Sequence, residues 1–177
     1  MAYNRTFAGI RAQHSAYTYE FIDEFLKHSK IERIVELGTA AGALTLYFGI
    51  LGKIANWEVH SFDRVETAKD IQRAFKALDI NYHVENIFSD DGLKHVQALI
   101  EEKPTFLLCD NGHKIREFNT FVPFLLSGSV VATHDWGVEI RQGDVDALCK
   151  KRKLLPYKEK MWTEPMRDLK LAVWFVP

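Results

Sequence analysis

Short apolar runs alternate with longer stretches in which apolar residues recur every three or four positions. The short runs are typical of buried strands, and the repeats are typical of amphipathic helices. The pattern predicts a first helix that begins at Ser15. It predicts strands at 32–37, 57–62, 80–85, 105–110 and 129–134. Further helices are predicted at 43–54, 66–78, 90–102, 114–125 and 142–153.

This alternation predicts the fold class. Strands that alternate with helices form crossover units, and such units build a parallel sheet covered by helices on both faces. Near the end of the chain, 154–162 and 169–176 both have β character with no helix between them. A short loop, 163–168, joins them, so we expect this pair to be antiparallel. We predict one α/β domain over 1–177, Rossmann-like and doubly wound, in which 1–30 form an ordered lead-in and a helix.

A glycine turn lies at the first predicted strand-to-helix junction. The apolar run before it contains Glu36, and the turn extends from Gly38 to Gly42. A dinucleotide-binding turn would have glycine at its first, third and sixth positions, whereas this chain has Gly38, Ala40 and Ala43. An acid beside the turn also disfavours a diphosphate. We therefore expect a cationic nucleoside such as S-adenosylmethionine, with Glu36 holding its ammonium directly or through water.

Asp63 supports the nucleoside interpretation. It ends the second predicted strand, 21 residues after Gly42, and an acid at about that spacing binds ribose hydroxyls in nucleotide-binding folds. The alternative is that the glycines only make a tight turn and that Glu36 is a solvated strand end.

Composition narrows the function classes. Of the 177 residues, 47% are hydrophobic and 27% are charged, and the net charge is −1. These values predict a soluble globular protein without a broad nucleic-acid-binding surface. The sequence shows no secretion signal or membrane-spanning run, so we expect a cytoplasmic protein. Two cysteines, Cys109 and Cys149, are expected to be reduced. The basic run 150–153 is interpreted as a last helical turn rather than a phosphate-binding patch.

Polar residues follow the fourth and fifth predicted strands. Asp110 follows one, and His134 and Asp135 follow the other. Ligands bind beyond the carboxyl ends of such strands, and two carboxylates with an imidazole can hold a divalent cation. Helix capping is the alternative role for each acid. His113 is the best candidate for a proton acceptor, and a partly exposed histidine at a helix start is its alternative.

Other chemically active side chains have weaker signals. His60, His83 and His95 show no cluster spacing and are expected to be structural or exposed. His14 precedes the first helix and could close over a ligand. Trp136 could stack on an aromatic substrate, close off a pocket or pack in the core.

Together these residues resemble those of class I S-adenosylmethionine-dependent methyltransferases, and more narrowly the small-molecule O-methyltransferases grouped with cephalosporin hydroxylase-like proteins. The resemblance covers nearly the whole chain and implies a seven-stranded sheet with an antiparallel C-terminal strand. Metal-using relatives often have two acidic or amide side chains after the fifth strand, where this chain has His134 and Asp135. The residues that carry the resemblance are Glu36, Gly38–Gly42, Asp63, Asp110–His113, His134 and Asp135.

The resemblance also implies residue roles. Glu36 and the glycine loop would bind the methionine moiety, Asp63 the ribose, and Ile87 or Phe88 the adenine. Asp110 would lie at both the cofactor and the catalytic site, beside His113. Metal ligands would be Asp110, His134 and Asp135. The implied cofactor-binding set is Glu36, Gly38, Thr39, Ala40, Gly42, Asp63, Ile87, Phe88 and Asp110.

The sequence therefore predicts methyl transfer from S-adenosylmethionine to a hydroxyl of a small molecule, with assistance from a divalent cation such as Mg²⁺. Two alternatives are a nicotinamide-dependent oxidoreductase and a catalytically silent cofactor-binding module. The expected partner is a small-molecule acceptor, with a second copy of the chain as a candidate to complete its site.

Overall fold

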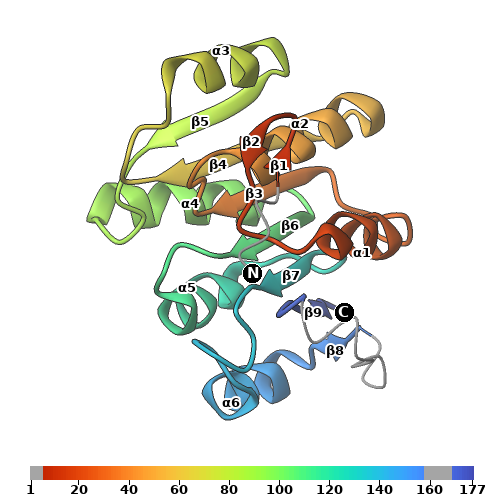
Figure 1. Cartoon of the computed structure of the whole chain (residues 1–177). Coiled ribbons are helices and arrows are strands. Elements are labelled where there is room, and N and C mark those ends of the chain that lie inside the picture. The colour runs from red at the N-terminus through yellow and green to blue at the C-terminus, as the bar shows by residue number, and fades with distance from the viewer. Residues whose placement is uncertain (1–5, 158–168) are drawn as a thin grey trace.

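A computed structural model of the chain describes residues 6–157 and 169–177. Its central sheet has seven strands in the order β5-β4-β3-β6-β7-β9-β8 (Figure 1). The predicted α/β fold class is confirmed, including the mostly parallel sheet. The strands are β3 (Arg33–Leu37), β4 (Glu58–Asp63), β5 (Ile80–Val84), β6 (Thr105–Cys109), β7 (Val130–Thr133), β8 (Leu155–Pro156) and β9 (Ala172–Phe175).

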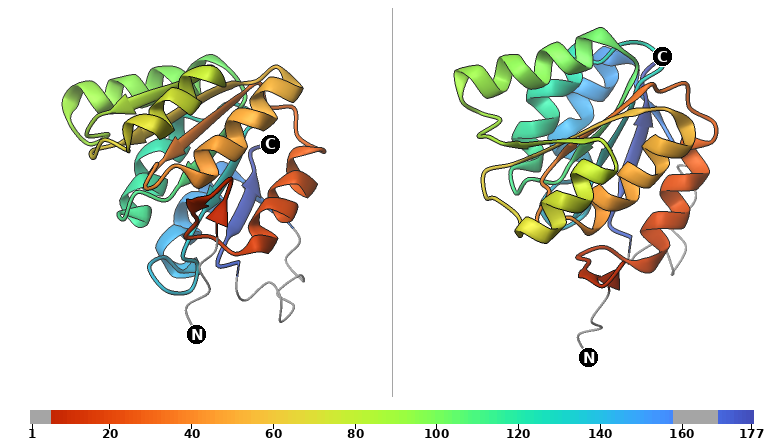
Figure 2. Two further views of the ribbon diagram at one scale, coloured as in Figure 1. Left: turned by 45° about the horizontal axis from the view of Figure 1, so that its top comes forward. Right: turned by 90° about the horizontal axis from the view of Figure 1, so that it is seen from above.

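Helices cover both faces of the sheet. Figure 2 shows α1, α2 and α3 on one side and α4, α5 and α6 on the other. The right-handed crossovers of a doubly wound sheet produce this division. The helices are α1 (Ala16–Leu26), α2 (Ala43–Ala55), α3 (Lys69–Ala77), α4 (Asp90–Glu102), α5 (Lys114–Phe121) and α6 (Gln142–Arg152).

The core consists of two apolar layers, one on each face of the sheet. Neighbouring residues of one strand point to opposite faces. Ile34 and Phe106 therefore pack in the layer beneath α1 and α2, whereas Val35 and Leu107 pack in the layer beneath α4 and α5. All four side chains are fully buried. The central strands are thus apolar on both faces, which leaves their ends as the places for polar chemistry.

The C-terminal strand is antiparallel, as predicted. β9 pairs antiparallel with β7, with Val130 opposite Phe175, and it also pairs with β8. Of the predicted β segments, 158–162 lie outside the described residues, as does the loop 163–168. The extent of the domain, 1–177, stays a prediction.

The N-terminal lead-in contains a hairpin that the sequence did not reveal. β1 (Thr6–Phe7) and β2 (Ile10–Arg11) are joined by Ala8 and Gly9, which both have positive φ, 50° and 80°. Positive φ at both central residues is the type I′ geometry that suits a two-residue hairpin. Strands of two residues are too short to show a period of two, so no sequence pattern announces them.

Two helix boundaries differ from prediction. α3 begins at Lys69 rather than at 66, because the preceding turn is fixed by hydrogen bonds from the Val65 amide to Asp63 and from the Thr67 amide to the Tyr82 hydroxyl. α5 ends at Phe121 and continues as a 3₁₀ turn that contains Pro123, since proline cannot donate the next helical hydrogen bond.

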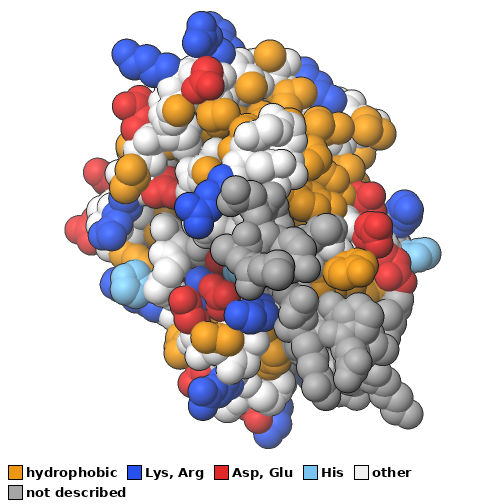
Figure 3. Space-filling view, viewed as in Figure 1, with side chains coloured by type: hydrophobic (Ala, Val, Ile, Leu, Met, Phe, Trp, Pro, Cys, Tyr) orange, Lys and Arg blue, Asp and Glu red, His pale blue; other side chains and the backbone are white. Residues whose placement is uncertain are grey.

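Two features of the helices concern the surface of the molecule. Among the described residues, no helix combines the length and the apolar character needed to cross a bilayer. Helix α2 exposes Ile50 and Ile54, 40% and 78% accessible. Hydrophobic side chains also gather on the face of the molecule that Figure 3 shows.

Candidate active site at the strand ends

The glycine loop fits tightly against the end of β6. Gly38 has φ +109°, and a Cβ there would lie 2.5 Å from the Asp110 carbonyl oxygen. Gly42 has φ +88° and precedes α2, and its Cβ would lie 2.7 Å from the Phe75 ring. Both positions therefore exclude a side chain on steric as well as conformational grounds. The close approach brings the loop and Asp110 into one site.

Asp63 fixes the loop from the neighbouring strand. Its carboxylate accepts hydrogen bonds from the Ala40 amide (2.9 Å) and the Val65 amide (3.0 Å). Ala40 itself has φ +48°, so the bond from Asp63 holds an unfavourable backbone conformation. Asp63 lies beside the loop, where the sequence expected it, and its role in binding ribose stays a prediction.

Glu36 is buried beneath the same loop. Its side chain points toward α2, and Oε2 accepts hydrogen bonds from the Thr45 and Ser61 hydroxyls, both at 2.5 Å. Ser61 is directly opposite Glu36 in the β3–β4 pair. The residue is 1% exposed, so the alternative interpretation as a solvated strand end is wrong.

The burial of Glu36 has an electrostatic consequence. Removal from water raises the pKa of its carboxyl to about 8, against the opposing effect of the two hydroxyl donors, and the charges of Asp110 and Asp63 add to the rise. The ionised form is therefore unfavourable in the free protein. A cation bound nearby would restore it.

Asp110, His134 and Asp135 lie together, as the parallel strand order predicted. His134 Nδ1 lies 3.3 Å from Asp110 Oδ1 and 3.5 Å from Asp135 Oδ2. His14 joins them from the N-terminal segment, with Nε2 3.0 Å from Asp110 Oδ2. Burial alone would raise the pKa of Asp110, but the bonds to His134 and His14 hold that pKa well below its usual range. Asp110 is therefore a permanent buried anion.

Lys114 supplies the main counter-charge, and the sequence did not single it out. Its Nζ lies 3.2 Å from Asp110 Oδ1, 3.2 Å from Asp135 Oδ2 and 2.8 Å from Glu139 Oε2, and its side chain is only 4% exposed. Burial alone would lower the pKa of the ammonium, but the three carboxylates raise it above the usual lysine value. Lys114 is therefore a fixed cation and not a proton acceptor.

Glu117 fixes the turn that precedes α5. It is fully buried, and its carboxylate accepts the backbone N–H groups of Asn111 (3.1 Å) and His113 (2.9 Å). Burial raises the pKa of Glu117 to about 7, against the effect of these two donors. This bond pattern makes His113 the residue before the helix and turns Lys114 inward.

His113 lies on the outside of this turn. It is exposed, and its ring faces Phe88 with the centroids 6.2 Å apart. The ring of His113 therefore lies against Phe88, whereas the side chain of the next residue, Lys114, contacts Asp110. Arg116 lies over the Phe88 ring at 3.9 Å. Of the two predicted adenine-flanking residues, Phe88 is partly exposed and Ile87 is fully buried in the core.

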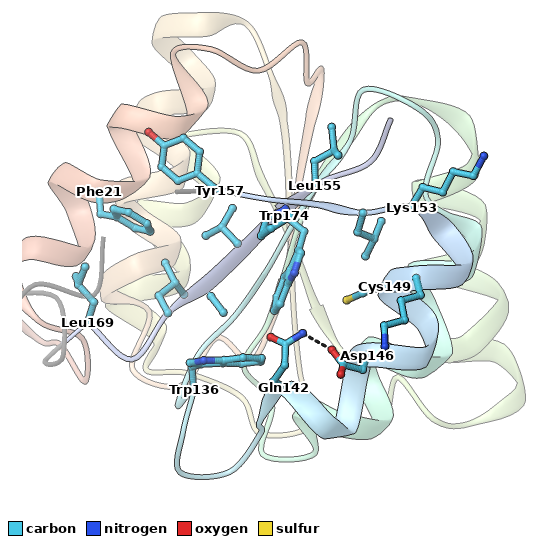
Figure 4. A pocket seen from close by; sticks show the side chains of 16 residues that line it. Phe21, Trp136, Gln142, Asp146, Cys149, Lys153, Leu155, Tyr157, Leu169 and Trp174 are labelled. Atoms are coloured by element: carbon cyan, nitrogen blue, oxygen red, sulfur yellow. Dashed lines mark hydrogen bonds between the residues drawn. The ribbon is translucent and has the colours of Figure 1, made fainter. Parts of the chain in front are cut away.

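Two cavities lie near these groups without containing the cluster of His14, Asp110 and His134. The larger, about 580 Å³, lies between α6, β8 and β9, and Trp136 and Trp174 form part of its wall (Figure 4). Trp136 packs edge-on against Trp174, with ring centroids 5.3 Å apart. A second cavity, about 460 Å³, lies over the start of α5 and is lined by His113, Arg116 and Glu139 among others.

Three histidines that we expected to be structural or exposed lie close together in the structure. His60 Nδ1 lies 3.2 Å from His83 Nε2, and the His83 and His95 rings are 4.6 Å apart. Their spacing in the sequence shows no cluster, because only the pairing of β4 with β5 and the crossover through α4 bring them together. Burial first, and then repulsion from neighbouring cationic groups, lower the pKa of His60 and of His83 to about 4.

The remaining predictions concern the cysteines and the basic run. Cys109 and Cys149 are both free and buried. Lys150, Lys151 and Arg152 occupy the last turn of α6, and Lys153 caps it. This placement is the one expected for cations at a helix C-terminus.

Solved structures share this fold. The apo-structure of CmcI is 17% identical over 98% of this chain and 76% of that one, with a TM-score of 0.68. CmcI with Mg and SAM is 16% identical over 100% and 79%, with a TM-score of 0.66. An O-methyltransferase from Bacillus cereus in complex with SAH is 12% identical over 93% and 84%, with a TM-score of 0.58.

Comparisons of the sequence alone find no relative of the chain. No protein-family model matches it, and no curated protein matches it. The likeness to the solved structures is thus one of fold: the chain has the Rossmann-like fold of class I methyltransferases, with the C-terminal antiparallel strand that the sequence predicted.

Proposed function

We propose that this chain transfers a methyl group from S-adenosylmethionine to a hydroxyl of a small-molecule acceptor. The observation that carries the proposal is the contact between the glycine loop and the end of β6, where Gly38 leaves no room for a Cβ beside Asp110. A nucleoside held by this loop would have its reactive end at the Asp110 cluster. The fold shared with structures that contain SAM or SAH supports the choice of nucleoside.

Glu36 supports a cationic ligand. A buried carboxyl with a raised pKa is stabilised in its ionised form by a nearby positive charge. S-adenosylmethionine carries an ammonium and a sulfonium, which would stabilise the ionised form of Glu36, whereas the negatively charged pyrophosphate of a nicotinamide dinucleotide offers no such stabilisation. This difference disfavours the oxidoreductase alternative.

We propose that the acceptor approaches Asp110 from the side opposite to the nucleoside. Methyl transfer is an in-line displacement in which the acceptor oxygen attacks the methyl carbon, the bond from that carbon to sulfur breaks, and the acceptor proton passes to a base. Positioning therefore contributes most of the rate. His113 as that base stays a prediction. Because its ring contacts Phe88, we expect alanine at His113 to lower turnover less than alanine at His134.

Calorimetry with S-adenosylhomocysteine tests the proposal directly. We expect the purified chain to bind it, and we expect Gly38→Arg and Asp63→Ala to weaken binding at least tenfold, because one fills the loop and the other releases the Ala40 amide. His28→Ala is the control, since His28 is exposed at the end of α1. Absence of binding by the wild-type chain would end the proposal.

Turnover distinguishes the remaining alternatives. Transfer of labelled methyl from S-adenosylmethionine to a panel of sugar, catechol and polyketide hydroxyls would identify the enzyme. Tight cofactor binding without transfer across that panel would favour the silent module. Fluorescence titration with NADH would reveal a nicotinamide site.

The resemblance to O-methyltransferases also implies a divalent cation, and the predicted ligands can be tested for their fit to Mg²⁺. Asp110 and Asp135 each have an oxygen 3.2 Å from the Lys114 ammonium. Mg²⁺ requires an oxygen-rich octahedral shell, and a fixed ammonium among those oxygens competes with it. The set of Asp110, His134 and Asp135 therefore does not fit Mg²⁺ well, and we propose no step that depends on it.

A further inference from the structure

Three side chains from three separate segments converge at the strand ends. His14 precedes α1, Asp110 follows β6 and His134 follows β7, and each offers one ligand atom within 4.8 Å of the other two. Their side chains are 10%, 11% and 10% exposed. Two imidazoles and one carboxylate are a donor set that binds transition-metal ions in proteins.

The distances match coordination geometry. His14 Nε2 is 3.0 Å from Asp110 Oδ2, and His134 Nδ1 is 3.3 Å from Asp110 Oδ1. Ligand atoms bound to one ion at about 2.0–2.2 Å, with angles between about 90° and 105°, are separated by roughly the same distances. His14 Nε2 and Asp110 Oδ2 could therefore bind one ion in place, and the His134 ring, which faces Asp110 Oδ1, would turn toward that ion.

Lys114 determines which ligands are available. Its ammonium pairs with Asp135 and with one oxygen of Asp110, and Glu139 completes its contacts. Asp135 is thereby engaged, while Asp110 Oδ2 faces His14. The ligand set that this leaves has two nitrogens and one carboxylate oxygen. Imidazole nitrogen suits zinc, cobalt or iron, and a mixed nitrogen and oxygen set also admits manganese, whereas magnesium and calcium prefer oxygen alone.

We propose that His14, Asp110 and His134 bind one divalent transition-metal ion of the zinc and cobalt class, and that Lys114 keeps Asp135 out of the ligand set. The proposal deepens the proposed function because it shares Asp110 with it, but metal binding and cofactor binding are measured separately. His14 lies between the N-terminal hairpin and α1. The bound ion would therefore also hold this N-terminal segment against the ends of β6 and β7.

Cobalt provides the direct test, since its visible absorption reports ligand number and type. The chelator-treated full chain is titrated with Co²⁺, and binding of Zn²⁺ and Mg²⁺ is measured by calorimetry. We expect one Co²⁺ per chain, displaced by Zn²⁺ and unaffected by millimolar Mg²⁺. His14→Ala and His134→Ala should each weaken binding at least tenfold, and His28→Ala should leave it unchanged.

Two further variants separate the proposed ligands from the set predicted by sequence. Asp135→Asn should change Co²⁺ affinity by less than about threefold, because Asp135 pairs with Lys114. Lys114→Met should tighten Co²⁺ binding, since it removes a cation 3.2 Å from a ligand residue. S-adenosylhomocysteine binding by each variant shows that the variant is folded.

Two outcomes would overturn the inference. One is a wild-type chain that binds S-adenosylhomocysteine but not Co²⁺ or Zn²⁺. The other is loss of Co²⁺ binding in Asp135→Asn with retention in His14→Ala, which would restore Asp110, His134 and Asp135 as the ligands. A chain that binds the metal but not S-adenosylhomocysteine would contradict the proposed function and leave the metal site intact.

Discussion

Two charged clusters lie at opposite ends of the central strands and differ in the group that is buried. At the amino ends, Arg33 is 3% exposed, and its nitrogens donate to Glu58, Glu102 and the Leu99 carbonyl. The two partner carboxylates reach water, at 41% and 62% exposure. At the carboxyl ends, the carboxylate of Asp110 is buried together with the ammonium of Lys114.

The difference shows what each cluster contributes. Every side-chain nitrogen of Arg33 has an acceptor, and those acceptors come from β4 and α4, so the cluster joins the sheet to a covering helix and stabilises the fold. The Asp110 cluster joins His14, Asp110 and His134 from three segments and includes two imidazoles. The buried Glu36 nearby is unfavourable in its ionised form. Buried charge at the amino ends thus supports folding, while buried charge at the carboxyl ends is available to a ligand.

The largest effect on stability is expected at the amino ends. Arg33→Ala removes a buried cation and the packing of its stem, and it leaves the Leu99 carbonyl without its donor. We expect the free energy of unfolding to fall by about 3–5 kcal/mol, the range for truncation of a large buried side chain to alanine, with S-adenosylhomocysteine affinity unchanged within about twofold. Urea denaturation and calorimetry measure the two quantities.

Arg73→Ala is the matched control, because Arg73 is exposed on α3. A loss of less than about 1 kcal/mol in Arg33→Ala, or a large loss of cofactor affinity in a folded variant, would contradict the assignment of the two ends to different roles.

Glu36→Gln tests the carboxyl ends and should have the next largest effect. The carboxyl of Glu36 titrates near pH 4.5 in the unfolded state and near pH 8 in the folded state. Between these two pH values the folded state therefore keeps a proton that the unfolded state has released. The stability that this proton contributes is complete below pH 4.5 and declines as the pH rises toward 8. Glutamine is neutral throughout and should abolish that decline.

At pH 8 and without ligand, we therefore expect Glu36→Gln to exceed the wild type by about 2–4 kcal/mol in unfolding free energy. The same variant should bind S-adenosylhomocysteine more weakly. Parallel pH profiles for the two proteins in urea titrations between pH 5 and pH 8 would contradict the buried, protonated state of Glu36.

The fold and the proximity of the strand-end acids could be predicted from the sequence, because both depend on strand order alone. Asp110 and Asp135 follow neighbouring parallel strands, and that suffices to bring them together. Lys114 was missed because helical spacing does not show whether residue 113 or 114 faces inward. That choice depends on the turn bonds of Glu117 and on Gly112, which has φ +79°. His14 was only a weak guess, since its position depends on how the lead-in docks.

The histidine cluster was missed for a different reason. His60 and His83 lie on neighbouring strands but are not direct register partners: His60 pairs with Asn81, and His83 pairs with Phe62. Their contact therefore depends on the stagger of the strands and on side-chain rotation. Neither can be read from sequence spacing, although a histidine in each of two adjacent strands is a signal that could have prompted the question.

The smallest expected effect concerns the histidine cluster. It tests whether His83 has a structural role or a part in ligand binding. The unfolded imidazole titrates near 6.5 and the folded His83 near 4, so the unfolded state takes up protons first as the pH falls. Stability from the neutral form is complete above pH 6.5 and is lost between pH 6.5 and pH 4.

His83→Phe removes the titration while it keeps a ring stacked on Phe62, whose centroid is 4.4 Å away. We expect the difference in unfolding free energy between pH 7 and pH 5 to shrink by about 1–2 kcal/mol relative to the wild type, an amount reduced because His83 is partly exposed. S-adenosylhomocysteine affinity at pH 7 should not change, because the histidine cluster is built on β4, β5 and α4, whereas His14, Asp110 and His134 lie before α1 and after β6 and β7. An affinity loss in the folded variant would instead link the two sites and assign the histidines a part in ligand binding.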